Sequence, residues 1–182
     1  MTGKEISIKL REDARRLGLC DEWYGKWKDD SSLQELIDKF KRGNDFCFSK
    51  RWPSLSFIKK HFPQPLLRQN GILVDDTYSY PVRNPETRRL VYIRDYVLFG
   101  DSRSTIRYSF SKHSSNVWVR DTSRLKVDVK YGAFILVHLF DKATVEVKTD
   151  LVSKVCVIKH SADSVIIKDG VVTIRNEYNY LK

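Results

Sequence analysis

The chain has 182 residues and a formal net charge of +10, with 41% apolar and 31% charged residues. This length suits one ordinary domain or two small ones, and the composition excludes a disordered chain. No apolar run approaches the roughly 20 residues that cross a bilayer, and no apolar segment follows Met1 as in a secretory signal, so we expect no membrane association. The three cysteines are too few and too scattered for a disulfide framework, which favours a cytoplasmic protein.

The first third of the chain has helical periodicity. An apolar stripe that begins at Ile6 follows a capping-box pattern at Thr2 and Glu5, and the same two signals recur after Ser32. A proline at a first helical turn marks a further start. The predicted helices are, in chain order, residues 3–17, a segment between Ser32 and Gly43, and a short helix that begins near Pro53.

The segment 70–112 is transitional between the helical pattern and the β pattern. Short apolar runs predict strands at residues 72–74, 90–93 and 96–99. Residues 75–89 are polar and contain two prolines, so we predict a loop there.

A ten-residue repeat covers residues 113–172. One column of the repeat contains six β-branched residues at a constant step of ten: Val117, Val127, Val137, Val147, Val157 and Ile167. Apolar positions within each block lie two apart, which predicts about six residues of strand with one buried face and about four residues of turn. We expect the repeat to begin at residue 113, because the preceding block would place Arg107 in the valine column.

The repeat fits two architectures. In a β-solenoid with two blocks per coil, like residues stack in ladders along the axis. In an antiparallel β-meander or sandwich, most strands would be joined by hairpin turns, and only Asp169-Gly170 has such a sequence. The fold class is therefore α+β, with a β-solenoid favoured over a meander. The predicted organisation is a helical module at 1–69, transitional strands and loop at 70–112, and a β-repeat region with a C-terminal cap at 113–182.

The repeat resembles that of short-repeat β-solenoid proteins, in which an N-terminal helical segment precedes strands of the form small-x-Val-x-Val. The residues that carry this resemblance are Ala133–Val137, Ala143–Val147 and Ser153–Val157. The segments 10–21 and 53–62 are also similar to segments of uncharacterised proteins from bacterial mobile elements and phages. Neither resemblance implies an activity or a catalytic residue, because such repeats specify a shape.

The sequence contains no motif for nucleotide, dinucleotide or metal chemistry. Cys156 and His160 would lie about 13 Å apart along a strand, so we expect no metal site there. We expect His138 on the strand surface, His113 and His160 at block corners, and Cys20 and Cys47 in or near the helical core. No cofactor, metal or small-molecule substrate is inferred, and we expect that the protein is not an enzyme.

The basic excess is the only feature of the composition that points to a partner. A candidate basic and aromatic surface comprises Arg15, Arg16, Lys41, Arg42, Lys50, Arg51, Trp52, Lys59 and Lys60. Such residues suit phosphate contacts and base stacking. The leading hypothesis is an interaction or structural protein that binds a protein partner or its own copies through the β scaffold. A nucleic-acid-binding accessory protein of a mobile element or phage is the alternative, and an enzyme without a recognisable motif is the third.

Overall fold

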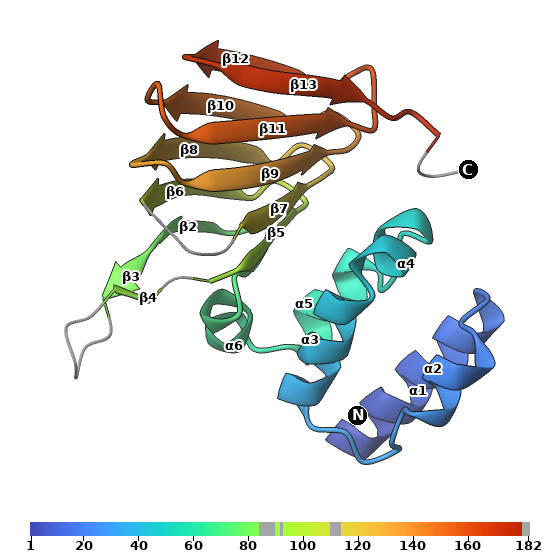
Figure 1. The fold of residues 1–182 in the computed structure, drawn as a ribbon. Coiled ribbons are helices and arrows are strands. Elements are labelled where there is room, and N and C mark those ends of the chain that lie inside the picture. The colour runs from blue at the N-terminus through green and yellow to red at the C-terminus, as the bar shows by residue number, and fades with distance from the viewer. Residues whose placement is uncertain (84–89, 92, 110–113, 180–182) are drawn as a thin grey trace. The chain divides into compact units, whose positions relative to one another are not determined.

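The computed structural model describes residues 1–83, 90–91, 93–109 and 114–179. The chain forms two compact units, one over residues 1–67 and one from Arg68 onward. Figure 1 shows helices in the first unit and stacked strands in the second. Among the described residues, no helix combines the length and apolar character that spanning a bilayer requires.

The helical unit begins with two capped helices that the sequence predicts. In both, the cap side chain accepts from the amide three residues later and the glutamate there accepts from the cap amide, at Thr2–Glu5 and Ser32–Glu35. The helices are α1 (Gly3–Arg16), α2 (Asp21–Gly25), α3 (Leu33–Arg42), α4 (Asn44–Ser49), α5 (Leu55–His61) and α6 (Gln64–Gln69), which crosses the boundary between the units.

The third predicted helix starts slightly later than expected. Helix α5 begins at Leu55, because the Ser54 hydroxyl accepts the amide hydrogen of Phe57 and Pro53 lies outside the cap. The sequence does not predict α2, α4 or α6, which have five, six and six residues. Helices this short contain too few turns to show an apolar stripe.

The second unit is a parallel β-solenoid, which confirms the favoured fold and excludes the meander. One sheet has the strand order β1-β5-β7-β9-β11-β13 and the other β12-β10-β8-β6-β2, and every described pairing within these sheets is parallel. The strands are β1 (Ile72–Val74), β2 (Thr77–Tyr80), β5 (Asp95–Phe99), β6 (Arg103–Ser109), β7 (Ser115–Val119), β8 (Arg124–Lys130), β9 (Phe134–Leu139), β10 (Thr144–Thr149), β11 (Lys154–Lys159), β12 (Val165–Asp169) and β13 (Val172–Asn176). A separate antiparallel pair joins β3 (Val82–Arg83) to β4 (Leu90–Val91).

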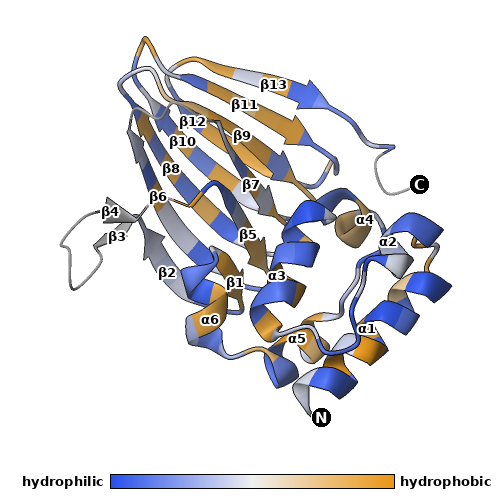
Figure 2. Cartoon of the chain, turned by 60° about the horizontal axis from the view of Figure 1, so that its bottom comes forward, coloured by the Kyte–Doolittle hydropathy of each residue, from blue (hydrophilic) through white to orange (hydrophobic). Residues whose placement is uncertain are grey.

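The register confirms two ten-residue blocks per coil. Val127 lies beside Val147 in one sheet, and Val137 lies beside Val157 in the other. These valines are 0–2% exposed, because the inward faces of the two sheets form one core. Figure 2 shows the resulting alternation of hydrophobic and hydrophilic residues along β8 and β10.

The repeat begins earlier than residue 113, contrary to the sequence prediction. Ile106 pairs with Val127, and Tyr96 pairs with Val117, so both occupy the inward valine column. The chain takes eleven steps from Ile106 to Val117 instead of ten, which displaces Arg107 from that column. The expected loop at 75–89 also contains β2 and β3, while residues 84–89 lie outside the described part of the chain.

The last member of the predicted valine column is also wrong. Lys168 pairs with Val147, whereas Ile167 pairs with the outward Glu146 and is 55% exposed. The cause is again one additional residue, because the chain takes eleven steps from Val157 to Lys168.

Aspartates connect successive coils at the corners that lead into the second sheet. Asp121 Oδ2 accepts the Gly100 amide hydrogen at a donor–acceptor distance of 2.9 Å, and Asp141 Oδ2 accepts that of Asp121 at 3.2 Å. Asp75 Oδ1 accepts from the amide of Asp101 at 2.8 Å. The three aspartates have φ values of 49–60°, a left-handed conformation that aspartate tolerates better than most residues. This aspartate ladder fixes the relative height of neighbouring coils.

Candidate functional site at the last coil

The last coil of the solenoid consists of β12 and β13, which are the terminal strands of the two sheets. Among the described strands, β12 pairs only with β10 and β13 pairs only with β11. Figure 1 shows both strands at the red end of the stack. One edge of each strand is therefore without a neighbouring strand in the described chain.

The backbone of β12 directs specific groups to its free edge. The Val165 amide donates to the Ala143 carbonyl at 3.0 Å, so Val165 faces β10. Successive residues of a strand direct their N–H and C=O groups to opposite sides. Ile166 and Lys168 therefore direct their backbone donors and acceptors away from β10.

The backbone of β13 has the same arrangement. The Glu177 amide donates to the Lys159 carbonyl at 2.8 Å, which fixes the alternation of the preceding strand. The backbone groups of Val172, Ile174 and Asn176 consequently point to the free edge. Both terminal strands thus present a row of backbone donors and acceptors suited to an added strand.

The core layer of the last coil is only partly covered. Ile174 is 42% exposed, although its register partner Val157 is fully buried one coil earlier. Ile166 and Val172 are half-buried, although they also belong to the inward columns. The last coil therefore combines unpaired strand edges with exposed aliphatic side chains.

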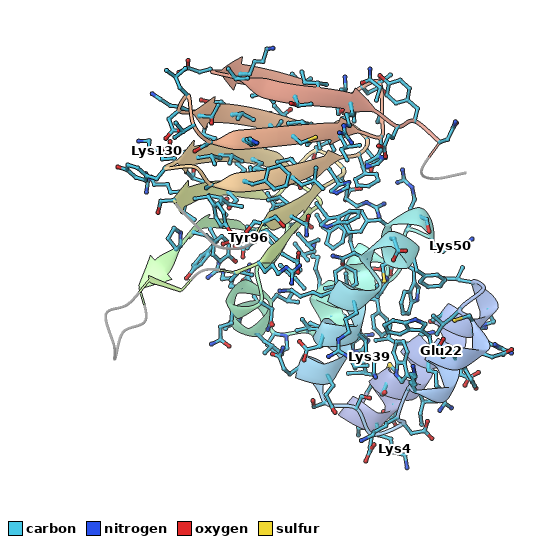
Figure 3. The ribbon with its side chains drawn as sticks, in the orientation of Figure 1. Lys4, Glu22, Lys39, Lys50, Tyr96 and Lys130 are labelled. Atoms are coloured by element: carbon cyan, nitrogen blue, oxygen red, sulfur yellow. The ribbon has the colours of Figure 1, made fainter. Side chains whose placement is uncertain are left out.

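Further exposed apolar residues lie at the corners where the chain passes from the second sheet back to the first. Tyr131, Leu151, Val152 and Val171 are 66%, 93%, 68% and 68% exposed. They come from three successive corners, after β8, β10 and β12. Figure 3 labels Lys130 at the first of these corners. An exposed apolar row next to an open sheet edge is typical of an interaction surface.

The nine residues of the predicted basic surface all belong to the helical unit. Arg15 and Arg16 lie on α1, Lys41 and Arg42 at the end of α3, Lys50, Arg51 and Trp52 after α4, and Lys59 and Lys60 on α5. Figure 3 labels Lys50.

Several members of this surface have partners within the helical unit. Arg15 forms an ion pair with Asp21, and Arg16 forms one with Asp13. The Trp52 ring is half-buried, with its centroid 6.3 Å from that of Trp27. These contacts reduce the charge and the aromatic surface available to a nucleic acid.

An aromatic stack on the outward face of the first sheet is the feature that sequence reasoning missed. The rings of Trp118 and His138 are parallel within 5°, with centroids 4.0 Å apart. His160 stacks on Phe140 at 4.4 Å. The only sequence signal is the spacing of twenty residues that places Trp118 and His138 in one outward column.

Hydrogen bonds define the protonation of the two histidines. The Glu177 carbonyl can only accept, so His160 Nδ1 donates to it at 3.1 Å. His160 Nε2 then accepts from His138 Nδ1 at 3.0 Å. Burial, together with the repulsion from His160 when it is protonated, lowers the pKa of His138 to about 4, and burial also lowers the pKa of His160.

The structure corrects the expected surface position of His138, which is only 9% exposed because it lies within the stack. His160 lies at a corner as predicted, and His113 falls outside the described residues.

The cysteines lie in different environments. Cys47 is buried, as predicted, and burial raises the pKa of its thiol. Cys20 is exposed, contrary to the prediction, because it precedes α2 at its N-terminal end. Within the described part of the chain, no three histidine, cysteine or acidic side chains are grouped as metal ligands would be.

Comparisons with protein-family models, curated proteins and solved structures gave no match.

Proposed function

We propose that the protein is a non-enzymatic interaction protein whose solenoid binds a protein partner through its last coil. The observation that carries this proposal is the coincidence of free backbone groups and an incompletely covered core layer at β12 and β13. A partner strand would satisfy both at once, through main-chain hydrogen bonds and through burial of aliphatic side chains.

The chemistry of this surface favours an extended segment of protein over other ligands. The free edge groups follow the spacing of a β-strand, and the neighbouring corners add the exposed side chains of Leu151, Val152 and Val171. An added segment with one strand on each sheet would also remove the exposed edges, which are otherwise prone to unspecific pairing.

A nucleic-acid-binding role for the helical unit is the second candidate. Arg42, Lys50 and Lys60 are exposed, and none forms an ion pair with another described residue. An anisotropy titration with mixed-sequence DNA tests this candidate, since phosphate contacts lose affinity steeply as the salt concentration rises. Charge reversal at Lys41-Arg42 and Lys59-Lys60 should then weaken binding regardless of the DNA sequence.

The experiment for the leading proposal is selection of peptides from a display library against the full chain. Enriched peptides are then measured by fluorescence anisotropy against Ile174→Lys, which places a charge in the uncovered layer. Thr173→Lys is the matched control, because Thr173 is the adjacent residue and points to the opposite face of β13.

We expect binding of selected peptides to fall at least tenfold in Ile174→Lys and to change less than twofold in Thr173→Lys. Equal affinity for both variants would place the binding site elsewhere and contradict the proposal. Far-UV circular dichroism of the two variants verifies that they retain the fold.

A further inference from the structure

We infer that the strand accepted by β12 contains a carboxylate side chain that faces Lys168. This inference rests on the proposed function and specifies the chemistry of its partner. It is carried by the position of a lysine in an otherwise aliphatic column.

Lys168 occupies an inward position of the solenoid. Its register partner Val147 is 1% exposed, and the next residue in that column, Val127, is 2% exposed. In-register parallel strands place such residues on the same face, so the Lys168 side chain begins at the core face of the last coil. Lys168 remains exposed because no further coil follows in the described chain.

The ammonium group of Lys168 has no acidic partner among the described residues. The neighbouring Asp169 points to the outer face, where its carboxylate lies 4.0 Å from Lys148 Nζ. An added strand would cover Lys168 together with Ile166. An aliphatic residue at the facing position would bury the ammonium group without a partner, whereas a carboxylate would accept its hydrogen bonds.

This lysine also disfavours a second copy of the chain as the occupant. If two last coils met about a two-fold axis through Ile167, Lys168 of each copy would face Ile166 of the other, and both ammonium groups would enter the same layer. Like charges in adjoining cross-strand positions are destabilising, and inward charges on terminal strands are a known means of preventing such association. A different protein with an acidic side chain at this position avoids the conflict.

Peptides derived from this chain provide a direct test. The probe is a fluorescent peptide of residues 143–160 with Cys156→Ser, which reproduces the coil formed by β10 and β11. Added in the same register above the last coil, its Val147 faces Lys168 and its Val157 faces Ile174. A second peptide contains Val147→Asp as well. Both are titrated against the full chain and against Lys168→Val, with Lys148→Val as the control because Lys148 points outward.

We expect the Asp-containing peptide to bind the native chain at least tenfold more tightly than the parent peptide. Lys168→Val should reverse this preference, and Lys148→Val should retain it. Equal binding of both peptides to the native chain, with amide protection of Ile166 and Ile174 in hydrogen exchange, would overturn this inference and leave strand addition intact. Absence of binding and of protection with both peptides would overturn strand addition by a coil-like segment, and with it this inference. A concentration-dependent dimer that Lys168→Val does not strengthen would overturn the argument against a second copy.

Discussion

The first coil of the solenoid is closed by an ion pair and a ring contact, whereas the last coil is open. Arg68 donates two hydrogen bonds of 2.7 Å to Asp76, and its guanidinium lies 5.0 Å from the centre of the Tyr78 ring. The Tyr80 hydroxyl donates to the Arg68 carbonyl at 2.8 Å. The inward column that begins at Tyr80 in the first coil ends at Lys168 in the last coil. Lys168 has no acidic partner among the described residues. The first coil thus ends in an internal ion pair, and the last coil ends in free strand edges with exposed aliphatic side chains.

The largest expected effect contrasts a cation at the first coil with an exposed cation of β10 that lies beside Asp169 of the last coil. Arg68→Ala removes the guanidinium that binds the Asp76 carboxylate, whose side chain is 5% exposed. We expect a loss of about 3 kcal/mol in the free energy of unfolding of the solenoid. Lys148→Ala, which removes the exposed partner of Asp169, should change it by less than about 0.5 kcal/mol. Urea unfolding, monitored by hydrogen exchange of core amides, measures the free energy of unfolding of both variants. Equal losses in the two variants would contradict the proposed difference between the first and the last coil.

The next effect concerns the corner between β5 and β6, one coil from the closed end. A Cβ atom at Gly100 would lie 1.9 Å from Asp75 Oδ1, and the φ of +69° disfavours a side chain as well. Gly100→Ala should therefore cost about 2–3 kcal/mol of stability. Gly132 has a similar φ of +74° and no atom within 4 Å of the added Cβ, so Gly132→Ala should cost about 1 kcal/mol. A thermal-unfolding comparison that ranked the two variants in the reverse order would refute the role of the Asp75 contact.

Acidification should destabilise the solenoid through His138 and His160. His138 and His160 have lowered pKa values in the folded state, so the unfolded chain binds more protons between about pH 6.5 and pH 4. Stability should be constant above this window and fall by about 2 kcal/mol as the pH decreases through it. Unfolding curves measured at several pH values test this expectation. His138→Phe should flatten the dependence, and an unchanged slope in that variant would contradict the assignment.

The smallest expected effect is at the open end itself. Ile174→Ala should reduce the free energy of unfolding by less than about 1 kcal/mol, because the side chain is already 42% exposed. The same truncation at its buried register partner Val157 leaves a cavity and should cost about 2 kcal/mol. Chemical denaturation of the two variants gives the ratio. A large loss for Ile174→Ala would show that the last coil is better covered than its exposure indicates.

The sequence predicted the solenoid because the inward columns repeat at a step of ten wherever the corners have constant length. It misplaced the start of the repeat and the role of Lys168 because one additional residue, before Val117 and again before Lys168, shifts the column without changing the composition. A periodic pattern cannot show such shifts, since pairing across the sheet determines the register. The inward position of Lys168 could therefore be recognised only from the register, which places Lys168 and not Ile167 beside Val147.

The aromatic stack and the cap of the first coil were less accessible to sequence reasoning. Trp118 and His138 share a column, but their stacking depends on side-chain rotation and on the neighbouring His160. Arg68 lies eight residues from Asp76, and only the turn from α6 into the first coil brings them together. The predicted basic surface has a definite sequence pattern, yet ion pairs at Arg15 and Arg16 show that charge in the sequence does not equal charge available to a ligand.

The aspartate ladder has a consequence for how this chain can change during evolution. Each carboxylate of the ladder accepts a hydrogen bond from an amide of an adjacent coil. A deletion between Gly100 and Ser102 would therefore break the hydrogen bond to Asp75 in the preceding coil and the one to Asp121 in the following coil. The opposite corners contain one link of the same kind, because Asp150 Oδ2 accepts the Tyr131 amide hydrogen at 2.7 Å. Their lengths nevertheless differ: three residues join β8 to β9, four join β10 to β11, and two join β12 to β13. The corners that contain Tyr131, Leu151 and Val171 should therefore tolerate changes in length better than the corners of the aspartate ladder. Homologous chains could diversify there while the stacking of their coils is conserved.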